Sequence, residues 1–178
     1  MAYLLLYIDD IVVTASDSTL LTSIITMLSR EFAMTDLGLL HYFLGITVTR
    51  DSTGFLSQSQ YARDVLHRAN MTGCKSCATP YDRGSKLGAN DGALLDDGTL
   101  YRRLAGALQY LTFTRPDITY AVQQICLFMH APQEPRFAFL KRILRYLQGT
   151  IGFGLHLSAS STSSLTAYSD ADWGGGLP

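Results

Sequence analysis

The first fifteen residues constrain the fold most, because two short apolar runs stand on either side of adjacent carboxylates, Asp9 and Asp10. Residues 4–8 and 11–13 have the length and the β-branched and aromatic content of buried strands. An Asp-Asp pair between them predicts the tip of a tight β-hairpin. Carboxylates in such apolar surroundings need a counter-charge. Mg²⁺, which takes oxygens from one or two carboxylates and from phosphates, would supply it.

The 178 residues suit one domain or pieces of two, and 47% hydrophobic with 16% charged residues is typical of a soluble globular chain. No apolar run approaches the roughly 20 residues of a membrane span. The first apolar run lacks a basic leader, so we expect no signal peptide and no secretion. Cys74, Cys77 and Cys126 are too few for a disulfide scaffold and are expected to be free thiols rather than half of a zinc site.

Charge is distributed unevenly along the chain although its net value is only −1. Residues 1–50 contain two arginines and five acids, whereas residues 101–150 contain seven lysines and arginines and two acids. An acidic tip followed by a basic region is what a metal-dependent enzyme acting on nucleic acid would need.

Along the chain, the pattern predicts an α+β protein. Polar residues at 16–18 indicate the start of a helix that runs to about residue 32 and packs under the hairpin. Residues 41–50 then indicate a strand, residues 51–54 a turn, and residues 55–57 a return strand.

The second half is predicted to be mainly helical. Helices are expected at about 60–69, 100–113, 116–130 and from 136 to about 149, with a long loop at 70–99 that we interpret as a flexible spacer. A final hairpin is expected from strands at 152–157 and 165–170, the second ending in Asp170.

The last predicted helix has an apolar stripe formed by Phe137, Leu140, Leu144 and Leu147. Four cations lie mostly off that stripe: Arg136, Lys141, Arg142 and Arg145. They could form a solvated charged face or a face that contacts phosphates, and the charges alone favour neither.

Beyond these patterns, Tyr7-Ile-Asp-Asp10 resembles the YxDD catalytic motif of reverse transcriptases. Further pieces follow in the order seen in reverse transcriptases of copia-type long-terminal-repeat retrotransposons. They are Phe32-Ala-Met-Thr-Asp-Leu-Gly38, Tyr42-Phe-Leu-Gly-Ile46, Gly106-Ala-Leu-Gln-Tyr-Leu111, Thr114-Arg-Pro-Asp-Ile118, Lys141-Arg-Ile-Leu-Arg-Tyr-Leu147 and Tyr168-Ser-Asp-Ala-Asp-Trp173.

This resemblance implies a domain organisation. Residues 1–58 would be the C-terminal part of a polymerase palm, with a primer-grip hairpin that includes Phe43, Leu44 and Gly45. Residues 59–150 would be a thumb-like helical region with its long loop at about 70–99. Residues 151–178 would begin an RNase H domain in which Asp170 is a metal ligand.

The resemblance also implies a chemistry. Asp9 and Asp10 would be catalytic ligands of two Mg²⁺ ions that support nucleotidyl transfer. Tyr7 would contact the primer end, and Lys141, Arg142 and Arg145 would contact nucleic acid. The implied partners are an RNA or DNA template–primer duplex, deoxynucleoside triphosphates and a fingers and palm segment, but no membrane. The implied location is a cytoplasmic particle or the nucleus.

A palm also needs an acid upstream of YxDD, which these residues do not supply. We therefore expect the chain to be inactive alone and to hold Mg²⁺ weakly. Two alternatives remain open at this stage. The chain could be a non-catalytic nucleic-acid-binding remnant, or a degenerate and poorly folded relic whose uncovered apolar strands invite aggregation.

Overall fold

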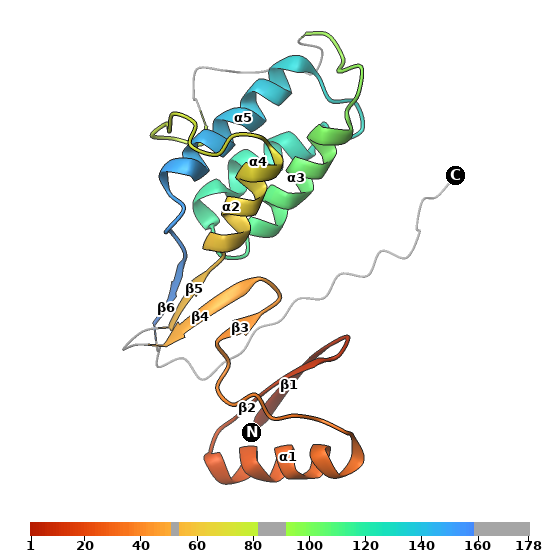
Figure 1. The fold of residues 1–178 in the computed structure, drawn as a ribbon, viewed down its shortest axis with the longest axis vertical. Helices are drawn as coiled ribbons and strands as arrows, with labels where there is room; N and C mark the ends of the chain where they lie inside the picture. Colours follow the sequence, from red (N-terminus) through yellow and green to blue (C-terminus); the bar gives the residue numbers. More distant parts are fainter. Residues whose placement is uncertain (51–53, 82–91, 159–178) are drawn as a thin grey trace, which may run out of the picture.

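The computed structural model describes residues 1–50, 54–81 and 92–158. These residues form an α+β arrangement in which a two-stranded hairpin with its helix, a four-stranded sheet and a helical unit follow one another (Figure 1). The predicted mixture of helices and antiparallel strands is therefore confirmed. None of the helices in the described ranges has the length and apolarity needed to cross a bilayer.

The N-terminal hairpin pairs β1 (Ala2–Tyr7) with β2 (Asp10–Ala15), from Ala2 opposite Ala15 to Tyr7 opposite Asp10. Helix α1 (Ser18–Glu31) follows after Asp17, whose carboxylate accepts a hydrogen bond of 2.8 Å from the Leu20 amide and so caps the first turn. Helix α1 contacts β2, as predicted, but none of its residues is fully buried.

The second sheet has the antiparallel order β3-β4-β5-β6, from β3 (Tyr42–Phe43), β4 (Ile46–Arg50), β5 (Gly54–Ser57) and β6 (Leu155–Leu157). The prediction of one continuous strand over 41–50 is wrong. Leu44 and Gly45 have φ values of 48° and 79° and form a tight turn between β3 and β4. Positive φ at both central residues is what a type I′ hairpin turn requires, and glycine adopts it at no steric cost.

The strand predicted at 152–157 is present as β6, and it pairs with β5. Gly154 permits this pairing, because a Cβ there would lie 2.3 Å from the Leu56 carbonyl oxygen. The predicted partner strand at 165–170 lies outside the described residues. Strands almost a hundred residues apart in sequence thus close one sheet.

The helical unit consists of α2 (Ser59–Arg68), α3 (Thr99–Leu111), the 3₁₀ turn η1 (Pro116–Ile118), α4 (Thr119–Cys126) and α5 (Glu134–Gly149). Helices near 60–69, 100–113 and 136–149 are therefore confirmed. The helix predicted to reach residue 130 ends at Cys126. The amides of Phe128 and Met129 donate to carbonyl oxygens three residues earlier rather than four, so the chain continues in tight turns.

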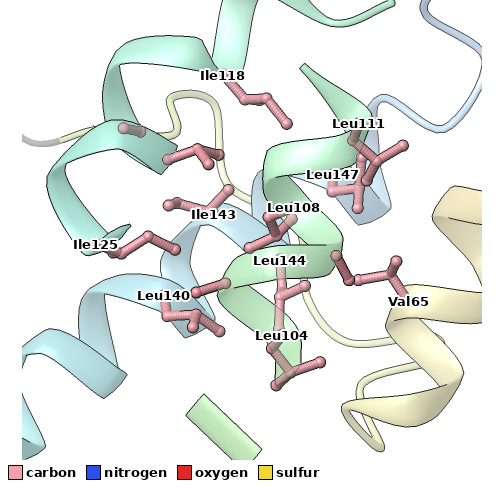
Figure 2. Packing of buried hydrophobic residues seen from close by; sticks show 14 of the residues in the cluster. Val65, Leu104, Leu108, Leu111, Ile118, Ile125, Leu140, Ile143, Leu144 and Leu147 are labelled. Atoms are coloured by element: carbon pink, nitrogen blue, oxygen red, sulfur yellow. The ribbon is translucent and has the colours of Figure 1, made fainter. Parts of the chain in front are cut away.

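The core of the described residues lies among these helices (Figure 2). Leu108 of α3 and Leu144 of α5 are fully buried near its centre, with the equally buried Ile125 of α4 on one side and Val65 of α2 on the other. The predicted stripe of α5 is confirmed at Leu140, Leu144 and Leu147, and it also includes Phe139 and Ile143.

The described parts of the 70–99 loop lie against this core rather than hanging free of it. The Cys77 thiol donates to the Arg142 carbonyl oxygen at 3.4 Å, and the Gly73 amide donates to the Gln148 side chain at 3.1 Å. On the far side, the Leu95 amide donates to the Pro132 carbonyl oxygen at 2.9 Å. These segments are therefore part of the packed unit, and the interpretation as a flexible spacer is wrong for them. Residues 82–91 lie outside the described residues.

Candidate catalytic hairpin and nucleic-acid interface

The two candidate catalytic carboxylates lie at the connection of the N-terminal hairpin, but not together at its tip. Tyr7 pairs with Asp10, so the two-residue turn consists of Ile8 and Asp9, and Asp10 is the first residue of β2. The prediction of an Asp-Asp tip is therefore displaced by one residue. The register of the two strands therefore places the turn at positions 8 and 9.

Ile8 has a φ of 50°, a conformation that a β-branched residue rarely adopts. Strain of this kind is of order 1–3 kcal/mol and persists only where the surrounding structure imposes it. Asp9 and Asp10 are both solvent-exposed, as is Tyr7. Exposure leaves the carboxylate oxygens free of a desolvation penalty and accessible to a cation.

A pair of exposed carboxylates is a partial donor set for a hard cation. Mg²⁺ commonly takes one or two carboxylates and completes its octahedron with waters and substrate phosphates. Within the described residues, no group of three or more His, Cys, Asp or Glu side chains is placed to hold a metal ion. Asp9 and Asp10 therefore fit Mg²⁺ as a two-ligand contribution, and phosphate or other oxygens would have to complete the site.

The two strands of this hairpin differ in how far their apolar residues are buried. Every residue of β1 is exposed, including Leu4, Leu5 and Leu6 at 51–62% exposure, whereas Ile11 to Val13 of β2 are half-buried. An apolar strand with an open edge is a strong candidate for pairing with another strand. The observed exposure of β1 is thus consistent with the alternative in which uncovered apolar strands invite aggregation.

The three residues predicted as a primer grip lie at the β3–β4 turn. Phe43 pairs with Ile46, and Leu44 and Gly45 form the turn itself. The hydroxyl of Tyr110, on α3, donates a hydrogen bond to the Leu44 carbonyl oxygen. Sequence reasoning did not identify Tyr110, although it belongs to one of the motifs that carry the family resemblance.

The cations of α5 do not form one uniform face. Lys141 and Arg145 are exposed, and the Lys141 ammonium lies 4.5 Å from the centroid of the Phe137 ring. Arg142 is half-buried and donates to the Thr79 hydroxyl at 2.9 Å, which ties α5 to the loop. Arg136 is only 4% exposed, and its guanidinium lies 3.7 Å from the Phe128 ring centroid. The expectation that Arg136 lies on a charged surface is therefore wrong.

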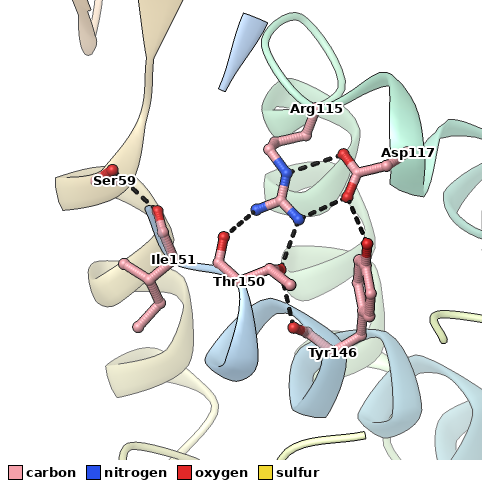
Figure 3. A network of polar contacts seen from close by, with 6 residues as sticks. All are labelled: Ser59, Arg115, Asp117, Tyr146, Thr150 and Ile151. Carbon is pink, nitrogen blue, oxygen red and sulfur yellow. Dashed lines mark hydrogen bonds and ion pairs between the residues drawn. The ribbon is translucent and has the colours of Figure 1, made fainter. Parts of the chain in front are cut away.

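A partly buried ion pair, not predicted from the sequence, joins η1, α5 and the segment that leads to β6 (Figure 3). Arg115 is 2% exposed, and its Nε and Nη2 donate to the two Asp117 carboxylate oxygens at 2.9 and 2.7 Å. Its Nη1 donates to the Thr150 carbonyl oxygen at 2.9 Å, and the Tyr146 hydroxyl donates to Asp117 at 2.9 Å. The network fixes the end of α5 just before the chain enters the sheet.

These contacts determine the protonation states of Asp117 and Tyr146. Burial alone would raise the pKa of Asp117, but the hydrogen bonds and charge of Arg115, together with the Tyr146 hydroxyl, outweigh it and leave the pKa below its ordinary value. Burial and the neighbouring Asp117 raise the pKa of Tyr146. Asp117 is thus ionised and Tyr146 protonated at neutral pH, as the ion pair requires. The other predicted metal ligand, Asp170, lies outside the described residues.

Comparisons with known proteins agree with the motif series. Residues 3–83 match the family described as reverse transcriptase (RNA-dependent DNA polymerase). The chain is 49% identical over 176 residues to the retrovirus-related Pol polyprotein from transposon RE1 of Arabidopsis thaliana, covering 98% of this chain but 12% of that protein. It is 35% identical to the Pol polyprotein from transposon TNT 1-94 of Nicotiana tabacum, covering 14% of its length.

For a shorter relative, the match spans a larger share of that protein's length. An uncharacterised mitochondrial protein of Arabidopsis thaliana is 47% identical, and the match spans 97% of this chain and 72% of that protein. No solved structure matches the chain. The carboxylate hairpin, the ordered motifs and these similarities together show that the chain belongs to the reverse transcriptase family of copia-type retrotransposon Pol polyproteins.

Proposed function

We propose that this chain supplies the carboxylate hairpin and a duplex-contacting helical surface of an RNA-directed DNA polymerase. The observation that carries the proposal is the position of Asp9 and Asp10 at the connection of an exposed hairpin, in a chain of this family. Residues 1–58 would act as palm, residues 59–150 as thumb, and residues from 151 as the start of an RNase H domain.

In this proposal, Asp9 and Asp10 hold Mg²⁺ with the help of substrate phosphates. When bound, such ions assist attack by a primer hydroxyl and stabilise the leaving pyrophosphate. The chain's own residues orient the substrates. Tyr7, opposite Asp10 in the hairpin register, would contact the primer end, and the turn at Leu44 and Gly45 would hold that end in line.

Among the predicted nucleic-acid contacts, the exposed pair Lys141 and Arg145 is better placed than Arg142. Both have their charged groups in solvent, where phosphates can reach them. Arg142 already donates to Thr79, so its removal would disturb the loop as well as any phosphate contact. The proposed duplex surface therefore rests mainly on Lys141 and Arg145.

The metal part of the proposal is tested with Mn²⁺ as a paramagnetic probe. In an isotope-labelled full chain mixed with template–primer, we expect Mn²⁺ to broaden the amide signals of residues 7–11 first. Asp9→Asn with Asp10→Asn should abolish that broadening, whereas Asp64→Asn, which removes an exposed acid of α2, should leave it unchanged. Broadening that is equal in the double variant would refute the metal site.

The nucleic-acid part is tested by the salt dependence of duplex binding. Each phosphate contact contributes roughly one unit to the slope of log affinity against log salt. We expect Lys141→Ala and Arg145→Ala each to reduce that slope by about one unit. Arg30→Ala, which removes an exposed cation of α1, should not. Salt-independent binding, or no binding at low salt, would remove the proposal.

Catalysis itself is a separate question. Because no group of three or more His, Cys, Asp or Glu side chains in the described residues is placed to hold a metal ion, we expect no primer extension by this chain alone with Mg²⁺ and any template. Nucleotide incorporation that Asp9→Asn abolishes would overturn that expectation while strengthening the assignment of Asp9. The alternative, a non-catalytic binding remnant, predicts salt-dependent binding without any response of residues 7–11 to Mn²⁺.

A further inference from the structure

The hydroxyl of an aromatic side chain links the turn between β3 and β4 to the helical unit. Tyr110 lies near the end of α3, and its hydroxyl donates a hydrogen bond to the carbonyl oxygen of Leu44, 66 positions earlier in the chain. The same ring lies beside Gly45, because a Cβ built there would meet Tyr110 Cε1 at 3.8 Å. Tyr110 is therefore hydrogen-bonded to one residue of the turn and adjacent to the other.

Neighbouring aromatic rings hold Tyr110 in place. Tyr61 of α2 meets it edge-on with ring centroids 5.2 Å apart, and Phe113 meets it edge-on at 5.6 Å. The Arg68 guanidinium lies 5.4 Å from the Tyr61 ring centroid on the other side. Edge-to-face pairs of this kind are the preferred arrangement of aromatic side chains. The ring thus has little freedom to follow the turn if the turn moves.

The turn itself has few other constraints. Strand β3 contains only Tyr42 and Phe43, and its pairing with β4 ends where the turn begins. Leu44 is a non-glycine residue at a positive φ of 48°, a conformation that needs support from its surroundings. Burial raises the pKa of the Tyr110 phenol, with the Tyr61 hydroxyl as the next cause, so the hydroxyl keeps its proton at neutral pH.

We propose that Tyr110 is a positioning residue whose hydroxyl fixes the β3–β4 turn relative to the helical unit. The inference rests on the proposed function, in which this turn holds the primer 3′ end. It extends that function by making the position of the primer end depend on α3. A shift of the helical unit over the duplex would then move the turn with it, because the ring and the turn backbone are in direct contact.

The test uses Tyr110→Phe, which removes the hydroxyl and keeps the ring with its aromatic contacts. We expect amide exchange of residues 42–48 to accelerate roughly two- to tenfold, the range for loss of one hydrogen bond. Tyr146→Phe is the matched control, since it also removes one tyrosine hydroxyl bond, to Asp117, at a site distant from the turn in the sequence. Unchanged exchange at residues 42–48 in Tyr110→Phe would overturn the inference.

A second measurement ties the turn to the primer end. Binding of a duplex with a recessed 3′ end is compared with binding of a blunt duplex of equal length, in the full chain. We expect Tyr110→Phe to lower the preference for the recessed end while blunt-duplex affinity stays the same, and Tyr146→Phe to lower neither. An unchanged preference despite faster exchange would also overturn the positioning role. A wild-type chain without any preference would instead refute the proposed function of the turn, and the exchange result would still decide whether Tyr110 fixes it.

Discussion

Asp117→Asn is the most informative perturbation of the folded helical unit, because it removes the carboxylate that pairs with the buried guanidinium of Arg115. Arg115 has 2% exposure and would keep its contacts to Thr150 but lose its counter-charge. Asparagine can still accept one of the two hydrogen bonds that Arg115 now donates. The substitution therefore removes the charge of Asp117 and nearly preserves the size and shape of its side chain.

The magnitude follows from the geometry. A hydrogen bond to a charged group is worth about 1.5–3 kcal/mol, and breaking a fully buried ion pair costs about 3–5 kcal/mol. The Asp117 side chain is 31% exposed, so water can reach the site and compensate in part. We expect the free energy of unfolding to fall by about 2–3 kcal/mol. For a chain of this size that lowers the melting temperature by about 4–12 °C.

The assay is thermal unfolding followed by far-ultraviolet circular dichroism, with Asp64→Asn as the control. Asp64 is exposed and accepts one hydrogen bond of 3.1 Å from Gln60, so its variant loses the same charge without uncovering a buried cation. We expect the control to shift the melting temperature by no more than about 2 °C. A shift in Asp117→Asn no larger than in Asp64→Asn would refute the reasoning.

The dependence on pH gives an independent check. The folded-state pKa of Asp117 lies below its ordinary value of 3.8, so the ionised carboxylate stabilises the folded state above that value. That stabilisation is lost as pH falls through the lowered pKa. The difference between wild type and Asp117→Asn should therefore be full at neutral pH and disappear only in strong acid.

Further substitutions test individual elements. Gly45→Ala should destabilise the fold by about 1 kcal/mol, because alanine is strained at a φ of +79°. Gly106→Ala in α3, where a Cβ meets nothing within 4 Å, should instead stabilise the fold by about 0.5–1 kcal/mol. Chemical denaturation measures both changes. Ile8→Gly should slow amide exchange in β1 and β2 by relieving the φ of 50° at a side chain that is already 78% exposed, and equal or faster exchange would contradict the strain. Leu108→Ala should cost about 2–5 kcal/mol because Leu108 is fully buried, and Leu100→Ala, at 42% exposure, much less; similar denaturation midpoints would contradict the position of the core.

Much of the secondary structure could be predicted because it depends on local patterns. Apolar residues that recur at helical spacing predicted helices close to α1, α2, α3 and α5, and the apolar runs predicted the N-terminal hairpin. The errors arose where one residue decides the geometry. Gly45 divides a run that otherwise looks like a strand, and the register of Tyr7 with Asp10 moves the turn by one residue.

The candidate site was predictable in part. Its carboxylates were recognisable from their apolar surroundings and the resemblance, since a metal ligand must be a charged oxygen donor. Tyr110 and Arg115 could not be found in this way, because their roles depend on partners 66 and 35 residues away. Arg136 shows the same limit, since its helical position suggested solvent and only tertiary packing places it against Phe128.

The carboxylates lie in a part of the described structure that has no fully buried residue. No residue of β1, β2 or α1 is fully buried, whereas α2 to α5 share a continuous core. Elements with few buried apolar contacts open at low free energy, and ligands that bind only the closed form stabilise it. Mg²⁺ with template–primer should therefore slow amide exchange in residues 2–15 while leaving residues of α3 and α5 nearly unchanged. Equal slowing in both parts would show that the ligand stabilises the whole fold, and the hairpin would then not be a separately ordered metal site.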